Sequence, residues 1–324
     1  MTPTIVTQPS VGNVIRNEEV YLSGATVRGA LLTAAISQRR DQVSEEVDRP
    51  HLVFHPAFPI KNGSVFKPAH PFIYKCKVCG EVRDCLADFL RDDLKIGRGV
   101  PPRLCPRGHI NTLKSLQGKL LDERFQEYEP AFTRVEAVGM NKIFKTSEIG
   151  MVFSYTCLAP GTRFRGTVVD LSGTRLDVLG LTGEREVRLG RGSSRGLGYA
   201  FVRVKEEPDY LKRLEQAVQL SIEKTRPYIL LKAVAPTLLP ALDASKPEGL
   251  EWQGAWLAGE KRFSGFSLST NRPKASLRCA APGSLVAYRV GTGDSWVRWV
   301  VDTCSLGLGP FNHLGLNLLE VMGP

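Results

Sequence analysis

The chain has 324 residues, of which 42% are hydrophobic and 23% charged, so it can fold into about two globular domains. Its net charge of +10 and pI near 9.3 favour a polyanionic partner such as nucleic acid, although a soluble protein that is merely rich in lysine has the same balance. No apolar run approaches the roughly 18 residues of a membrane helix, and the first residues lack a secretion-signal pattern. We therefore expect a cytoplasmic protein whose seven cysteines are thiols or metal ligands.

The first predicted element is a helix within residues 21–41, YLSGATVRGALLTAAISQRRD. Ser23 and Gly24 suit a helix start, whose free amide groups can hold a phosphate. Arg28 and Gly29 follow in the first turns and place a cation beside a residue without a side chain. The alternative is a helix whose glycine packs against a sheet. The helix itself is predicted by apolar residues at helical spacing, namely Val27, Ala30, Leu31 and Ala34.

Two ligand pairs, in YKCKVCG and RLCPRGH, predict a metal site. Each pair sits in a turn with glycine and basic residues, and four N and S donors suit tetrahedral Zn²⁺ in a closed, structural site. Cys85 is a possible substitute ligand. A catalytic zinc is not expected, because no His-x-Glu or His-Glu-x-x-His pattern occurs. The predicted ligands are Cys76, Cys79, Cys105 and His109.

Short β-rich runs follow from residue 131, broken at Pro160 and Gly161. Residues 209–224 have the spacing of an amphipathic helix, with an apolar face formed by Leu211, Leu214, Val218 and Ile222. After this helix we expect strands at RPYILLKAVAPTLLP, GSLVAYRV and SWVRWVVD. A second glycine-studded segment, SLGLGPFNHLGLNLLEV, closes the chain and ends as a strand.

The glycine-rich stretch LGRGSSRGLGYAFVRV, residues 189–204, lies between two predicted strands. Successive amide groups in such a turn form a concavity for phosphate oxygens, and guanidinium groups can clamp phosphates or stack on bases. A P-loop is excluded because no Gly-Lys-Ser/Thr ends the run, and a dinucleotide fold is disfavoured because a strand follows the glycines. A hairpin loop without a ligand remains the alternative. The candidate RNA-binding residues are Arg28 and, in this stretch, Gly190, Arg191, Gly192, Ser193, Ser194, Arg195, Gly196, Leu197 and Gly198.

Four stretches resemble motifs of the RAMP superfamily of CRISPR-associated proteins: YLSGATVRGALL, SEIGMVFSYTCLAPGTRFRG, GRGSSRGLGYAFV and CAAPGSLVAYRV. The second resembles a Glu-x-Gly-x-Leu-Phe…Pro-Gly-Thr-x-Phe segment of that family. The chain is most similar to the two-domain, Cas-five-like subunit of type III-D effector complexes, often labelled the Csx-ten type. The resemblance implies CRISPR RNA and other effector subunits as partners, with target RNA nearby and no membrane.

The resemblance also implies the fold, which is α+β with two ferredoxin-like (RRM-like) units closed by glycine-rich loops. The first unit would span residues 1–208 and carry the zinc-binding insertion at about residues 42–118, of which residues 42–75 are polar and read as irregular loop. The second, β-rich unit would span residues 209–324. The implied role is to hold the repeat-derived end of the guide RNA.

Family members that cut target RNA carry an aspartate before the first helix, where this chain has Asn17, Glu18 and Glu19. Because the longer side chain of Glu moves the carboxylate by roughly 1 Å, we interpret the subunit as non-catalytic. A cleaving backbone subunit remains an alternative. So do a metal-independent endoribonuclease using a histidine such as His313 in the second loop, and a zinc-containing scaffold that hardly touches RNA. His51, His55 and His70 are the other histidines considered.

Overall fold

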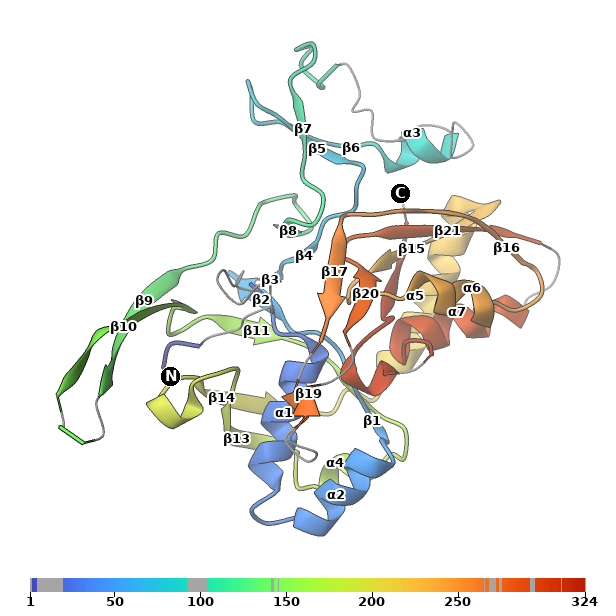
Figure 1. Cartoon of the computed structure of the whole chain (residues 1–324). Helices are drawn as coiled ribbons and strands as arrows, with labels where there is room; N and C mark the ends of the chain where they lie inside the picture. Colours follow the sequence, from blue (N-terminus) through green and yellow to red (C-terminus); the bar gives the residue numbers. More distant parts are fainter. Residues whose placement is uncertain are drawn as a thin grey trace.

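The computed structural model describes residues 2–4, 20–91, 104–140, 143–144, 146–264, 266–267, 272–273, 276–291, 295–309 and 311–323. These residues form a mixed α+β protein, as expected (Figure 1). The N-terminal elements are α1 (Gly24–Ala35), α2 (Arg40–Asp48), β1 (Leu52–Phe54), β2 (Phe58–Lys61), β3 (Ser64–Val65), β4 (Lys67–Pro68), β5 (Ile73–Cys76), β6 (Val82–Asp84), α3 (Leu86–Arg91), β7 (Leu113–Ser115), β8 (Leu120–Leu121), β9 (Phe132–Met140), β10 (Ser147–Leu158), β11 (Arg163–Arg165), β12 (Val168–Asp170), α4 (Arg175–Val178), β13 (Gly183–Arg188), the 3₁₀ turn η1 (Ser193–Arg195) and β14 (Tyr199–Val204).

The C-terminal elements begin with the predicted long helix. They are α5 (Tyr210–Thr225), β15 (Tyr228–Ala233), α6 (Leu239–Ser245), β16 (Leu250–Trp256), β17 (Glu260–Phe263), β18 (Phe266–Ser267), β19 (Arg272–Pro273), β20 (Leu277–Ala280), β21 (Leu285–Val290), α7 (Ser295–Ser305), η2 (Asn312–Leu314) and β22 (Leu319–Met322).

Helix α1 is the centre of the N-terminal core. It starts where the sequence predicts, because the Ser23 side chain accepts a hydrogen bond from the Thr26 amide at 3.3 Å. Its apolar face packs with α2, β1 and β13. Among the described residues of this half, the strands pair in twos and threes, as β1 with β12, β2 with β11 and β3, and β13 with β14.

Residues 42–75 are not the irregular loop that their composition predicts. They contain the end of α2 and five short strands, and Leu52 and Phe54 are fully buried in the N-terminal core. A buried ion pair fixes this segment, since Glu46 accepts a hydrogen bond from the Arg175 side chain at 2.9 Å and others from the amides of His51 and Leu52. Local composition did not reveal this packing, because its partners lie more than a hundred residues further along the chain.

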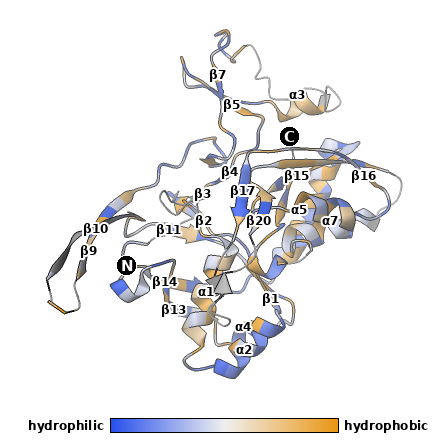
Figure 2. Ribbon diagram, in the orientation of Figure 1, coloured by the Kyte–Doolittle hydropathy of each residue, from blue (hydrophilic) through white to orange (hydrophobic). Residues whose placement is uncertain are grey.

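The C-terminal half is built on a four-stranded antiparallel sheet in the order β16-β21-β15-β22. Helix α6 connects β15 to β16, and α7 connects β21 to β22. Helices α5 and α7 contact each other and pack on one face of the sheet, where Ile229, Leu231 and Val286 join their apolar side chains. Figure 2 shows β15 as hydrophobic, in contrast to the hydrophilic β17.

The segment SWVRWVVD is helical, and our prediction of a strand there was wrong. It forms the first part of α7, and Trp296, Val300 and Cys304 recur every four residues on its buried side. Valine and tryptophan favour strands, but the length of the apolar repeat, 11 residues, fits a helix that covers the sheet.

Residues 69–91 and 104–121 pack on the other face of the C-terminal sheet. Leu230, Leu285 and Ala287 alternate with the residues that face the helices, and contact an apolar cluster that contains Phe72 and Phe89. The rings of Phe72 and Phe89 stack with centroids 4.2 Å apart. Burying one such side chain contributes about 1.5–3 kcal/mol to stability. The segment is therefore anchored on the C-terminal half by its own apolar side chains. We call residues 69–91 and 104–121 the cysteine module.

Candidate functional site

The glycine-rich loop connects β13 and β14, and its backbone has the conformation that its sequence predicts. The φ angles of Gly190, Gly192, Gly196 and Gly198 are 73°, 80°, 79° and 76°, all in the left-handed region that favours glycine. Ser193–Arg195 form a single 3₁₀ turn between these glycines. The loop therefore turns its chain direction several times within nine residues, which is the type of backbone that can point amide groups at an anion.

The ends of the loop are fixed to the protein. The Gly198 amide donates to the Pro3 carbonyl at 2.8 Å, and the Leu189 amide donates to the Gly198 carbonyl at 2.7 Å. The Leu197 side chain is buried against Cys157 of β10, so it belongs to the core. Residues 190, 191 and 193–196 are exposed. The two ends of the loop are thus fixed to the protein, and its polar, basic tip at residues 190–196 faces the solvent.

Arg195 lies over an aromatic ring of the neighbouring hairpin. Its guanidinium carbon is 5.4 Å from the centre of the Tyr155 ring, and it donates a hydrogen bond to the Tyr155 hydroxyl. Arg191 is exposed at the other side of the 3₁₀ turn. The sequence reasoning missed Tyr155, because it lies on β10, forty residues before Arg195, and no local pattern links the two.

Arg28 is held inside the molecule. Its guanidinium donates to the carbonyl of Glu46 in α2 at 3.0 Å, and burial lowers its pKa although Glu46 acts in the opposite direction. The expected phosphate site at the start of α1 is also filled. A β-carbon on Gly24 would lie 2.1 Å from the Phe54 carbonyl oxygen and 2.8 Å from that of Leu314. Gly24 is therefore required for packing, whereas a β-carbon on Gly29 would meet no atom within 4 Å.

The second glycine-rich segment packs against this same point. A β-carbon on Gly315 would lie 2.3 Å from the Phe54 carbonyl oxygen, and the turn η2 contacts both β1 and α1. Leu314 and Leu316 are buried beside it. The segment thus joins the two halves of the chain.

The four predicted metal ligands lie together at the end of the cysteine module. Their donor atoms are all within 4.8 Å of one another, although the two pairs are separated by 25 residues of chain. The Cys79 and Cys105 sulfur atoms are 3.9 Å apart, and the Cys76 sulfur is 3.7 Å from Nδ1 of His109. Tetrahedral zinc with Zn–S distances of about 2.3 Å separates its ligand atoms by about 3.5–3.8 Å. The spacing fits a metal of this size.

Hydrogen bonds to the sulfur atoms favour the thiolate form of these cysteines, which is the form that binds a metal cation. The amides of Val78 and His109 donate to the sulfur atoms of Cys76 and Cys105, and the Thr112 hydroxyl lies 3.1 Å from the Cys76 sulfur. Burial raises the pKa of Cys76, but the hydrogen bonds from Thr112 and from backbone amides outweigh it and bring the pKa to about 6. The proposed substitute, Cys85, is buried in the apolar cluster and is not among the four. Nothing in the sequence pattern had pointed to Thr112.

Two of the histidines considered for catalysis have fixed partners, and of these His70 is buried and His55 is half-buried. His55 Nε2 lies 2.7 Å from the Ser305 carbonyl, and burial lowers its pKa to about 4, so the ring is neutral and donates there. His70 accepts from the Phe72 amide and lies 3.3 Å from Asp84. Residues 17–19, which bear on target cleavage, lie outside the described residues.

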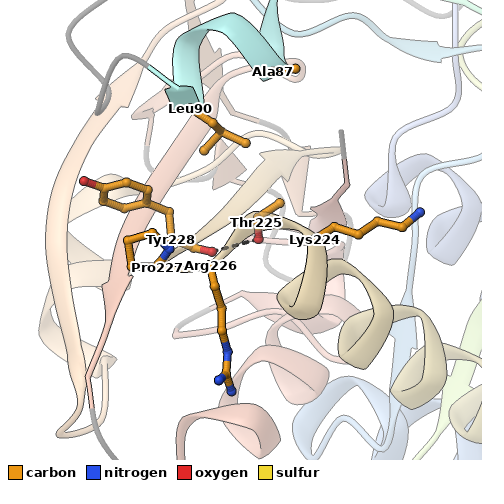
Figure 3. Close-up of a pocket in the computed structure, with 7 residues that line it drawn as sticks. All are labelled: Ala87, Leu90, Lys224, Thr225, Arg226, Pro227 and Tyr228. Carbon is orange, nitrogen blue, oxygen red and sulfur yellow. Dashed lines mark hydrogen bonds between the residues drawn. The ribbon is translucent and has the colours of Figure 1, made fainter.

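A hollow of about 280 Å³ lies between α3 and the turn from α5 to β15 (Figure 3). Its lining combines apolar side chains with polar and charged ones, and the Thr225 hydroxyl is already used in a hydrogen bond to the Tyr228 carbonyl at 2.7 Å. Among the helices that the structure describes, none is long and apolar enough to cross a membrane.

No family model matches the sequence, and no curated protein matches it. Among solved structures, a chain of a type III-B Cmr-beta bound to cognate target RNA aligns over 89% of this chain and 84% of its own length, with 13% identity and a TM-score of 0.49. A second such structure, with cognate target RNA and AMPPnP, gives 14% identity and a TM-score of 0.49 over the same shares. A chain of the Csm3-Csm4 subcomplex of the type III-A CRISPR-Cas interference complex covers 91% of this chain and 96% of its own, with 10% identity and a TM-score of 0.36.

Proposed function

We propose that this chain is a non-catalytic subunit of a type III, III-D-like RNA-guided complex and that it holds the repeat-derived end of the guide RNA. The observation that carries the proposal is the loop at residues 190–196. Its exposed tip combines left-handed glycines, two serines and two arginines on an anchored base. Amide groups and guanidinium groups in this arrangement suit the phosphates and bases of single-stranded RNA. The chain's net charge of +10 has the sign that such a partner requires.

The proposal includes the fold of the family. In the C-terminal half, four antiparallel strands in the order β16-β21-β15-β22, with helices connecting β15 to β16 and β21 to β22, have the connectivity of a ferredoxin-like unit. We assign the N-terminal half, residues 1–208, to a second such unit that carries the cysteine module.

We further propose that the cysteine module holds Zn²⁺. Three thiol sulfur atoms and one imidazole nitrogen are the donors that zinc favours, and four protein ligands complete a tetrahedral shell. The role of such an ion is structural. None of the seven cysteines, all of which lie in the described part of the chain, forms a disulfide, and a cytoplasmic location, which keeps thiols reduced, belongs to the same proposal.

The test is binding of the guide repeat RNA to the full chain in which Arg191 and Arg195 are both replaced by alanine. Each lost phosphate contact reduces the dependence of log affinity on log salt by about 0.7 for a single strand, so we expect weaker binding and a slope smaller by about 1.4. The control is Arg226→Ala with Arg289→Ala, which removes the same charge from two exposed arginines of the C-terminal half. Unchanged affinity and slope in the loop variant would exclude the loop as the RNA contact.

The same preparation separates binding from catalysis. Incubated with labelled repeat RNA in EDTA, the wild-type chain should leave the RNA intact, because His55 and His70 are engaged in the protein interior. Site-specific cutting that His313→Ala abolishes would instead identify a processing endoribonuclease.

A further inference from the structure

The outer end of the cysteine module carries three exposed aliphatic side chains. Val78, Leu104 and Ile110 are 64%, 49% and 66% exposed. Each is next in sequence to one of the four cluster residues, and Leu104 pairs with Ile110 in a β-bridge. Figure 1 shows this end of the module, beyond β5 and β7, projecting away from the C-terminal sheet. Large aliphatic side chains on fixed turns, directed at solvent, indicate a contact surface.

Three lysines accompany these aliphatic residues. Lys75 of β5 lies directly opposite Lys114 of β7 in the strand register, both are exposed, and exposed Lys77 follows two residues after Lys75. Like charges in directly opposed positions destabilise a strand pair. In the isolated chain the ammonium groups of Lys75 and Lys114 therefore repel each other, and an anionic partner bound between them would reduce this repulsion.

The acidic groups of the module do not compensate for these lysines. Glu81 pairs with Arg107 at 2.7 Å, and Asp84 pairs with buried His70 at 3.3 Å. Within the part of the chain that the structure describes, no carboxylate forms an ion pair with Lys75, Lys77 or Lys114. We call these three lysines, with Val78, Leu104 and Ile110, the knuckle face.

We propose that the knuckle face binds single-stranded RNA, with the lysines at phosphates and the aliphatic side chains against bases. The inference rests on the proposed function, since the guide complex supplies the RNA. RNA is favoured over a protein partner because lysine is depleted at the cores of protein interfaces, whereas phosphates attract it. The metal cluster and the buried Phe72–Phe89 stack hold the surface rigid, so little conformational entropy is lost on binding.

The knuckle face and the loop at residues 190–196 lie on different parts of the molecule (Figure 1). One RNA strand would contact the two surfaces with different nucleotides. The contributions of the two surfaces to the salt dependence should therefore be independent and additive.

The experiment compares zinc-loaded full chains for binding of a short, unstructured, fluorescein-labelled single-stranded RNA across a salt series. In one variant Lys75 and Lys114 are both replaced by glutamine, and in a second Val78 and Ile110 are both replaced by serine. The matched control replaces Lys212 and Lys224 by glutamine, two exposed lysines of α5 that carry the same charge. Zinc content, measured in every variant, shows that the module is intact.

We expect the lysine variant to bind more weakly, with a slope reduced by about 1.4 for two lost phosphate contacts. The serine variant should bind more weakly with an unchanged slope, and the control should resemble the wild type. If the knuckle variants match the control while the Arg191 and Arg195 variant loses affinity, the knuckle-face inference is wrong and the proposed function stands. If none of these variants loses affinity, both are wrong. Intact RNA binding with loss of a co-purifying acidic protein would identify a protein surface and overturn the inference.

Discussion

Two glycines of the β13–β14 loop should respond very differently to the same substitution by alanine. Gly196 has a φ of 79°, and a β-carbon there would meet no atom within 4 Å, so Gly196→Ala costs only the left-handed conformation, about 1 kcal/mol. A β-carbon on Gly198, at a φ of 76°, would lie 2.0 Å from the Leu189 carbonyl oxygen. The strand must then move and weaken the hydrogen bonds from Leu189 and to Pro3, each worth about 1 kcal/mol. We expect about 3 kcal/mol for Gly198→Ala.

Native-state hydrogen exchange measures this difference locally, on the peptide that spans residues 187–199. The gap of about 2 kcal/mol corresponds to exchange about 30-fold faster at the Leu189 amide in Gly198→Ala than in Gly196→Ala. Equal protection of this amide in the two variants would refute the reasoning, because it would mean that the close approach of Gly198 to Leu189 does not hold the loop base.

Three other changes test the interior of the protein. Glu46→Gln removes the buried carboxylate that pairs with Arg175 and leaves only the exposed Glu45 carboxylate as its ionic partner. We therefore expect it to lower the free energy of unfolding by about 3 kcal/mol in urea denaturation. Asp48→Asn, on the exposed side of the same helix, should have little effect, and equal losses in the two variants would contradict the buried pair. Cys105→Ser should abolish the binding of one zinc ion per chain, and Cys85→Ser should not, as measured by metal analysis of the purified variants. Zinc retained in Cys105→Ser would contradict the ligand assignment. Burial alone would raise the pKa of Glu320, but Lys232 and Lys67 outweigh it and lower the pKa from 4.5 to about 2. This carboxylate therefore stabilises the fold above pH 4.5 and loses that contribution as the pH falls towards 2. The difference in the free energy of unfolding between wild type and Glu320→Gln should accordingly shrink over this pH range. A difference that does not depend on pH would argue against the ion pairs.

Features set by short-range chemistry were predictable from the sequence. The start of α1 at Ser23, the long helix α5 and the strand β14 follow from caps and periodicity. The left-handed glycines and the four-residue metal cluster follow from residue types whose backbone or ligand chemistry has few alternatives. In each case the decisive groups are close in sequence, or share a ligand chemistry that the residue types and their spacing reveal.

Features set by distant contacts were not predictable. Arg28, a candidate RNA contact, also donates a hydrogen bond to a carbonyl of α2, and no local sequence pattern shows this partner. Gly24 looked like a phosphate site, but the backbone of Gly315, almost three hundred residues later, packs against it. The α7 segment was taken for a strand because its valines and tryptophans favour strands, and only the adjacent sheet makes a helix the better way to bury them.

The position of the cysteine module links metal binding to the stability of the C-terminal sheet. Cys76 and Cys105 belong both to the metal cluster and to the apolar cluster that covers Leu230 and Leu285. Strands β15 and β21 are apolar on both faces, so removal of the module would expose one face of the sheet to water. The predicted metal ligands therefore hold more than a surface insertion, because the same residues keep the module seated on the C-terminal sheet.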